Sequence, residues 1–386
     1  MPSCCSWPNS RAFPAPKLGK PLIFFSISTW NRKGIGFWFW TIAALLIPCF
    51  LAAFRAESIG TDVVGYAKPL FDLASRSSSF SDFNNAHWYR YWRDASPADF
   101  EQGYVFLVWI SAKLFHSFPA LLFFTQALTI VPIFAALLKS GGKYTVPFGM
   151  ATYFFLYFNV SLNMMRQWIA MAFVIYSLVA LYKRGDSFSS QIPCFMGILL
   201  ASLFHYSALF GVLSLLLLHL FARYNNKYAL LLACAVALLG PFLLGVFGNV
   251  LIMVGLGRYV NYIGGQLSIM PNQILIRLPL VLFAFLAASD KRFCSPLANF
   301  YFLSMLFGVS LSQLVSGGEN NGRIALYFDC FSVLVFGAYL SGHEERDSVI
   351  KVATALIFMA YLVFYWWFSF CYMGRNATVP YLSIFS

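Results

Sequence analysis

The stretch YTVPFGMATYFFLYFNVSLNMMRQWIAMAFVIYSLVALY, residues 144–182, holds two long apolar runs on either side of a short turn. A helix needs roughly 20 predominantly apolar residues to cross a bilayer, and each run approaches that length. The turn brings Arg166 and Gln167 to the mouth of the second run. An apolar helix that begins on a cation predicts a membrane protein with a charged group held at the membrane boundary.

The rest of the chain has the same composition. Of its 386 residues, 60% are hydrophobic and 10% are charged, whereas about a quarter of the residues of a soluble domain are charged. We therefore expect an all-α fold, a polytopic membrane helical bundle of about 11–12 transmembrane helices in a single domain at 36–386. The Pro-rich, basic segment 1–35 is expected to be a flexible cytoplasmic leader, and 55–102 one long outer loop.

Eleven apolar stretches are the expected passes. They lie near 36–54, 119–138, 144–160, 164–182, 191–205, 206–222, 228–246, 273–289, 296–315, 323–341 and 349–371. The shorter segment 103–117 carries Lys113 and is expected to be a re-entrant or interfacial helix, and the pair around LFHYSAL could be one bent element.

The net charge of +12 comes from Lys and Arg residues in short loops between apolar runs. This arrangement is typical of a topology signal and not of a nucleic-acid surface. Five cations precede the first pass, so we expect the N-terminus to be cytoplasmic. Later Lys and Arg pairs then fall on the inner side, and the outer side receives the loop 55–102 and the turns with Arg166, His205, Arg258, Glu319 and Arg323.

The eight cysteines show no CxxC spacing, and the sequence has no nucleotide-binding loop, HExxH motif or dinucleotide fingerprint. Cysteines inside apolar runs are read more simply as small apolar residues than as a metal site. No metal and no cofactor is expected.

Two arginines begin helices on the expected outer face. Arg166, followed by Gln167, is electrostatically unfavourable for its own helix, but a helix N-terminus with a guanidinium beside it is a good phosphate site. Arg323 follows SGGENNG in the same way, with Tyr327 one turn further on the same face. The alternative for such arginines is contact with lipid headgroups. Two such arginine sites can hold a diphosphate from two sides. Arg55, directly after the first pass, and Arg277, one turn into a later pass, are further candidate cations for binding a diphosphate or a sugar attached to it.

Three groups are candidates for acid–base chemistry on that face. Asp62 is either a cap of the helix that begins at Val63 or a site carboxylate. Glu101, two residues before an apolar helix, is either a cap or a general base. His205 is either a structural hydrogen-bonding group or a catalyst. Asp329, within a pass, is expected to pair with an arginine or to form hydrogen bonds inside the bundle.

Aromatic residues crowd the middle of the outer loop. They are Trp88, Tyr89, Tyr91 and Trp92. Such a stripe is typical of stacking on sugar rings, and equally of a belt at the lipid headgroups.

Five stretches, in this order, resemble the EpsG family of exopolysaccharide polymerases, relatives of the Wzy-type polymerases: IGTDVVGY, FEQGY, NMMRQWIA, LFHYSAL and RIALYFD. The resemblance runs from about residue 36 to the C-terminus and leaves loop 76–99 unmatched. It implies a GT-C-like, metal-independent glycosyltransferase of the bacterial inner membrane that joins oligosaccharide units carried on undecaprenyl diphosphate. A flippase and a chain-length regulator are the partners it implies.

Residue by residue, the resemblance carries over Asp62, Glu101, Arg166, Gln167, His205 and Arg323. Diphosphate is already a good leaving group, so two arginines suffice to stabilise its charge, and Glu101 or His205 would activate the acceptor hydroxyl. Direct displacement with inversion is the expected course. An O-antigen ligase-like transferase and a transporter of the lipid-linked sugar are the alternatives, the latter weakened by the lack of a visible repeat between halves.

Overall fold

The computed structural model describes residues 35–90, 93–141, 144–182, 188–223, 235, 253, 266–267, 271–289, 296–312, 314–315, 321–341 and 348–385. These residues are mostly helical, which agrees with the expected all-α class. Residues 1–34 of the expected leader and all of the expected pass at 228–246 except residue 235 lie outside the described residues, as do Tyr91, Trp92, Arg258 and Glu319.

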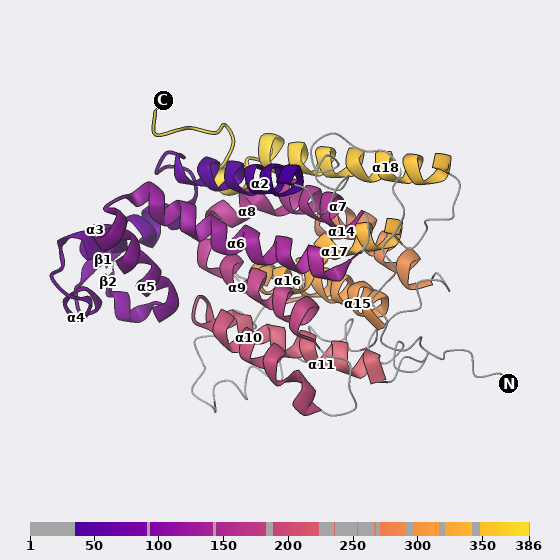
Figure 1. Cartoon of the computed structure of the whole chain (residues 1–386), viewed down its shortest axis with the longest axis horizontal. Coiled ribbons are helices and arrows are strands. Elements are labelled where there is room, and N and C mark those ends of the chain that lie inside the picture. Colours follow the sequence, from indigo (N-terminus) through magenta and orange to yellow (C-terminus); the bar gives the residue numbers. More distant parts are fainter. Residues whose placement is uncertain are drawn as a thin grey trace.

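Most helices run along the long axis of the molecule (Figure 1). Their bounds are α2 Ile35–Ala53, α6 Phe118–Ser140, α7 Thr145–Thr152, α8 Phe158–Asn163, α9 Met165–Tyr176, α10 Ile192–Ser202, α11 Phe210–Arg223, α14 Pro271–Ser289, α15 Pro296–Leu311, α16 Asn321–Asp329, α17 Ser332–Ser341 and α18 Ser348–Trp366. Helix α6 packs between α2 and α9, while α17 packs against α7 and α14. Their apolar side chains share one large core, as expected for helices that bury a stripe against one another.

Most expected passes coincide with helices, but two differ in form. The pass at 144–160 consists of α7, the π-helical turn η4 (Tyr153–Tyr157) and α8, joined end to end. The pass at 323–341 is divided into α16 and α17 at Cys330 and Phe331. Asp329 ends α16 at this break, where its side chain meets an arginine from another helix, described below.

Among the described residues, two helices are long and apolar enough to cross a bilayer, Phe118–Ser140 and Lys351–Tyr372. Other apolar helices are shorter: Thr41–Ala53, Gln102–Phe115, Met165–Leu181, Ser189–Ser202, Tyr206–His219, Ile274–Phe285 and Phe300–Leu311. The expected interfacial helix at 103–117 is among these short ones, formed by α5 (Gln102–Ile110) and the π-helical turn η3 (Ser111–Phe115).

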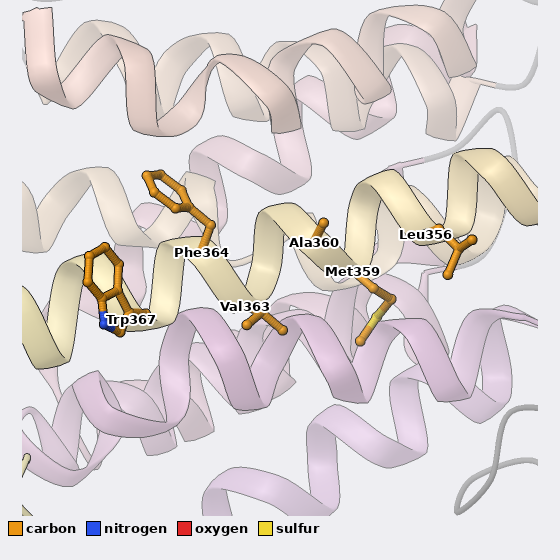
Figure 2. Close-up of a pocket in the computed structure, with 6 residues that line it drawn as sticks. All are labelled: Leu356, Met359, Ala360, Val363, Phe364 and Trp367. Carbon is orange, nitrogen blue, oxygen red and sulfur yellow. The ribbon is translucent and has the colours of Figure 1, made fainter.

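Helix α18 presents apolar side chains to the outside of the bundle. A pocket of about 560 Å³ lies along it, lined by Leu356, Met359, Ala360, Val363, Phe364 and Trp367. Figure 2 shows these six side chains. Leu356 and Phe364 are 60% and 59% exposed. Apolar surface of this kind is unfavourable in water and typical of a helix that faces lipid.

The expected outer loop 55–102 is instead a small folded unit with its own core. It contains η1 Val63–Ala67, α3 Lys68–Arg76, α4 Phe80–Asn84, β1 Trp88–Arg90, β2 Arg93–Ala95 and η2 Pro97–Asp99. The two strands form an antiparallel hairpin in which Trp88 faces Ala95. Together with α5 this unit lies at one end of the molecule, which we call the hairpin end (Figure 1).

Helix α9 connects the two cores. Met165 and Ile169, on its first turns, belong to the core of the hairpin end, whereas Trp168 and the buried residues from Ala170 onward belong to the large core of the bundle. The start of α9 is therefore fixed by packing on two sides, and the Arg166 side chain begins at the seam between the cores.

The C-terminal segment returns to the hairpin end. Ala56 donates its backbone N–H to the Leu382 carbonyl at 2.8 Å, and Ile384 donates to the Phe54 carbonyl at 2.9 Å. The Tyr381 hydroxyl donates to the Leu51 carbonyl at 2.7 Å. The side of the C-terminus, which the sequence left open, is thus the side on which α2 ends.

A buried ion pair joins α14 to α16 inside the bundle. The Arg277 Nε donates to the Asp329 carboxylate at 2.8 Å, and the two side chains are 15% and 7% exposed. Tyr157 donates its hydroxyl to the Asp329 carbonyl at 2.8 Å. Gly308 lies against the Asp329 carboxylate and leaves no room there for a larger side chain. The expectation that Asp329 pairs with an arginine is confirmed.

We predict that Asp329→Asn, which leaves the Arg277 charge without its partner, lowers the free energy of unfolding in detergent by about 3–5 kcal/mol. Adding Arg277→Met to Asp329→Asn removes both charges and should restore most of that loss. A double variant as unstable as the single variant would show that the pair is not the cause.

Candidate functional site

Arg166 is the second residue of α9 and pairs with Glu101 from the start of α5. The Arg166 Nη1 donates to Glu101 Oε2, and the side chains are 17% and 7% exposed. A cation at a helix N-terminus is unfavourable by itself, so the carboxylate from another segment offsets that cost. The pair joins two of the motif segments.

Two aromatic rings hold the same guanidinium. The Arg166 Cζ lies 4.5 Å from the centroid of the Tyr66 ring and 4.8 Å from that of Phe100. Both rings are nearly inaccessible to solvent. Cation–π attraction is stronger at desolvated positions such as this one, so the rings fix the direction of the guanidinium as well as its depth.

Asp62 occupies the cap position of η1, but its side chain makes no cap bond there, so the expected capping role is wrong. Its Oδ2 instead accepts from the Tyr66 hydroxyl at 2.5 Å and from the Met165 backbone N–H at 3.2 Å. The carboxylate therefore sits at the N-terminus of α9, where the helix dipole favours an anion.

The half-buried position of Asp62, outside the apolar spans, affects its ionisation. Burial raises the pKa of the Asp62 carboxyl above its ordinary value, against the lowering effects of the Tyr66 hydrogen bond and of Arg166 and Arg323. The hydrogen bonds from Tyr66 and Met165 both fall on Oδ2 of Asp62. Within the described part of the chain, Oδ1 has no donor.

Glu101 stands at the cap position of α5, and its side chain makes no cap hydrogen bond there. Its second oxygen, Oε1, accepts from the Tyr206 backbone N–H at 3.2 Å. Beside it, Gly103 donates to the Leu203 carbonyl at 2.8 Å, and a Cβ on Gly103 would lie 2.6 Å from that oxygen. The absence of a side chain lets α5 approach the turn that carries His205.

His205 lies in the turn between α10 and the 3₁₀ turn η7 (Tyr206–Leu209). Its Nδ1 accepts from the Ser207 backbone N–H at 3.3 Å and lies 2.5 Å from the Ser207 Oγ. The Ser207 Oγ also lies 2.9 Å from the Tyr327 hydroxyl of α16. Burial lowers the pKa of His205 to about 4, helped by Arg166 and Arg323 and opposed by Glu101. The imidazole is therefore neutral near pH 7.

Gln167 and Arg323 connect α9 to α16. The buried Gln167 donates its Nε2 to the Arg323 backbone carbonyl at 2.6 Å. The Arg323 side chain is half-buried and, among the residues that the structure describes, has no carboxylate partner. It nevertheless acts electrostatically on both Asp62 and His205. Arg323 is thus a cation of the cluster whose charge is available to a ligand.

Two arginines that were expected to bind the ligand, Arg277 and Arg55, are not open to a ligand in this cluster. Arg277 pairs with Asp329 instead. Arg55 is 2% exposed and covered by the C-terminal segment; its Nη2 lies 3.1 Å from the Met165 sulfur. Burial lowers the pKa of Arg55 to about 10. In this arrangement Arg55 is adjacent to the cluster but closed to a substrate. Tyr327, also fully buried, contributes its hydroxyl through Ser207 only.

Sequence reasoning missed several residues that build the site. Tyr66 and Phe100 hold Arg166, and Tyr66 could have been found because it follows Asp62 by one helical turn. Nothing in the sequence around Asn163 indicated its role. Its Oδ1 accepts from both the N–H and the hydroxyl of Thr61 at 2.7 Å, and its Nδ2 donates to Asn376 at 3.2 Å.

The aromatic stripe of the hairpin is divided by the fold. Trp88 stacks on Phe100 with centroids 5.7 Å apart, whereas Tyr89 is 73% exposed. Trp88 therefore supports the wall of the site, and Tyr89 faces outward. Within the described residues, no three His, Cys, Asp or Glu side chains gather as metal ligands, and the described cysteines Cys49, Cys194, Cys330 and Cys371 are free.

Apolar helices and a buried cluster of charges drawn from distant parts of the chain indicate a membrane protein with a polar site. A model of the EpsG family matches residues 37–383, nearly the whole chain, and the chain belongs to this family. Membership indicates an enzyme of the exopolysaccharide polymerase type that acts on a lipid-linked sugar. Comparison with curated proteins and with solved structures gave no match.

We predict that Glu101→Gln lowers the free energy of unfolding in detergent by several kcal/mol, because it leaves a buried guanidinium without its carboxylate. The matched control is Glu57→Gln. Glu57 is an exposed glutamate of the same end, 3.3 Å from Lys68, and loss of such a surface pair should change stability by less than about 1 kcal/mol. Equal effects of the two substitutions would contradict the structural weight given to the Glu101–Arg166 pair.

Proposed function

We propose that this protein joins oligosaccharide repeat units carried on undecaprenyl diphosphate, at the outer face of a bacterial inner membrane, during exopolysaccharide, capsule or O-antigen synthesis. The observation that carries the proposal is the convergence of five separate segments on one cluster, in a chain of the EpsG family. The segments contribute Asp62, Glu101, Arg166, His205 and Arg323.

The hairpin end is the part of the molecule that we propose to face outward, with the N-terminus in the cytoplasm. In a GT-C-like bundle of this orientation, the lipid tail lies among apolar helix faces. The diphosphate then reaches headgroup level, where Arg166 and Arg323 begin their helices. The sugars extend to the aqueous side.

The two arginines would share the diphosphate unequally. Arg166 is held by Glu101 and two rings, so it supplies a fixed positive end to the site. Arg323 has no such carboxylate among the described residues, and a planar guanidinium binds phosphate oxygens with two parallel hydrogen bonds. Gln167 fixes the start of α16 and therefore the base of the Arg323 side chain.

The chemistry then requires no metal in this proposal. The sugar's anomeric carbon is displaced from a diphosphate, which leaves readily once its charge is stabilised. Preorganised cations aimed at developing charge are typically the largest single contribution to such a step. Supply of the lipid-linked unit by a flippase and control of length by a regulator would be separate proteins.

We predict that Arg323→Ala abolishes chain growth in liposomes given lipid-linked units on the outer face, while membrane insertion and protein level stay normal. Arg323→Lys should lose at least about tenfold in rate, because a point charge does not reproduce the guanidinium fork. Arg76→Ala is the control, since Arg76 is an exposed arginine at the end of α3. Full-length chains from Arg323→Ala would remove the diphosphate contact.

The same liposomes separate the rival functions. Chain growth on the carrier lipid supports a polymerase. Transfer of finished glycan to another acceptor without growth would favour a ligase, and movement of the intact unit across the bilayer would favour a transporter. Either of these results would contradict the proposed function.

A further inference from the structure

Three groups of the cluster could transfer a proton: Glu101, His205 and Asp62. They differ in which of their polar atoms have no hydrogen-bond partner and could meet a substrate. Glu101 uses one oxygen for Arg166 and the other for the Tyr206 backbone N–H. Both carboxylate oxygens of Glu101 are thus occupied by donors and neither is open to an acceptor hydroxyl. Glu101 therefore positions Arg166 and the His205 turn, and the proton must go elsewhere.

His205 is restricted by its tautomer. A backbone N–H can only donate, so the Ser207 N–H requires an unprotonated Nδ1 on His205. A neutral imidazole carries one proton, which then resides on Nε2. The open side of His205 is thus an N–H donor and not a base. The Ser207 Oγ, 2.5 Å from this unprotonated Nδ1, must then donate its one proton to it. The same Oγ lies 2.9 Å from the Tyr327 hydroxyl, which connects this arrangement to α16.

Asp62 has the complementary property. Tyr66 and the start of α9 both donate to Oδ2, which fixes the carboxyl group and leaves Oδ1 without a donor among the described residues. Asp62 binds Met165, the first residue of α9, and His205 precedes Tyr206, whose N–H binds Glu101. Glu101 is the partner of Arg166, so Asp62 and His205 both lie around the start of α9.

Resting on the function proposed above, we propose that Asp62 Oδ1 is the general base for the acceptor hydroxyl and that His205 Nε2–H donates a hydrogen bond to the departing diphosphate. The acceptor oxygen forms a bond to the anomeric carbon as its proton passes to Asp62. The bond from the anomeric carbon to the diphosphate oxygen breaks, and that oxygen keeps the electron pair. Arg323 and the His205 N–H stabilise its charge, and Asp62 then returns the proton to water.

The burial of Asp62 suits this role. A base is most effective when its pKa is raised toward the working pH, and burial raises that of Asp62. The hydrogen bonds from Tyr66 and Met165 to Oδ2 fix the orientation of the carboxyl group.

Two isosteric pairs of variants test the proposal in the same liposomes. Asp62→Asn preserves the contacts with Tyr66 and α9 but cannot accept a proton, and we predict a loss of about 10²–10⁴-fold in rate. Asp62→Glu keeps a carboxylate and should retain more activity than Asp62→Asn. For His205, the Gln amide nitrogen reaches the position of Nε2 and the Asn amide does not. His205→Gln should therefore keep much of the rate, and His205→Asn should lose about 10²-fold.

The outcomes are distinct from those that test the proposed function. If wild-type protein makes no polymer from lipid-linked units, the proposed function fails. If wild-type protein is active and Asp62→Asn is equally active, Asp62 is not the base. If His205→Gln is as inactive as His205→Asn, the donor role of His205 is overturned. Thermal unfolding of each variant in detergent shows whether a loss of rate reflects loss of the fold.

The pH dependence of kcat/KM provides a second test of Asp62 as the general base. We predict that kcat/KM falls as pH decreases through the raised pKa of Asp62, because the protonated carboxyl cannot accept the acceptor's proton. The charged and titratable neighbours of Asp62 are Arg55, Tyr66, Tyr104, Arg166 and Arg323, and none of these gains a proton as the pH falls from about 8 to about 5. His205 remains neutral until about pH 4. If the fall of kcat/KM at low pH occurred at the same pH in Asp62→Glu as in the wild-type protein, Asp62 would not be the general base.

Discussion

The buried contact between Glu101 and Arg166 is the interaction on which the arrangement of the site depends. It places a cation at the N-terminus of α9, where the helix dipole opposes it. Two carboxylates from different segments offset this unfavourable interaction. Glu101 pairs with the guanidinium, and Asp62 accepts from the first backbone N–H of α9. Because neither carboxylate caps its own helix, both are available to hold α9 against the folded segment 55–102. The same contacts that stabilise the hairpin end therefore assemble the site.

Polar bonds across the chain then fix the remaining parts around this helix. Gln167 holds the start of α16, and Ser207 connects the His205 turn to Tyr327 of the same helix. Asn163, just before α9, binds Thr61 on one side and Asn376 on the other. A buried hydrogen-bond network of this kind specifies one geometry because each unmatched member would be costly. The result is a site in which one guanidinium is held firmly and another retains its charge for a ligand.

The sequence was sufficient for the helical class, for most helix positions and for the residues that meet in the cluster, because apolar runs and charges at their ends follow from transfer energies alone. It was insufficient wherever a partner came from far along the chain. Asp62 and Glu101 had plausible local roles as caps, and only the fold shows that their carboxylates turn to α9 and η7. Arg277 lay at the right depth for a ligand, yet Asp329 takes its charge. The sequence did not reveal that 55–102 is folded, because its helices and hairpin are too short to show a sustained hydrophobic periodicity.

Arg55 shows why charge alone does not identify a binding residue. It is more deeply buried than Arg166, and within the described residues its guanidinium meets a methionine sulfur and not a carboxylate. Desolvation lowers its pKa, as the cost of a buried cation requires. Its nearest negative neighbour in electrostatic effect is Asp62, since Tyr104 is a neutral phenol near pH 7. A cation so placed favours the ionised form of Asp62 without occupying either of its oxygens. Arg55 therefore contributes to the site through the field that it exerts, and the C-terminal segment that covers it keeps water from screening that field.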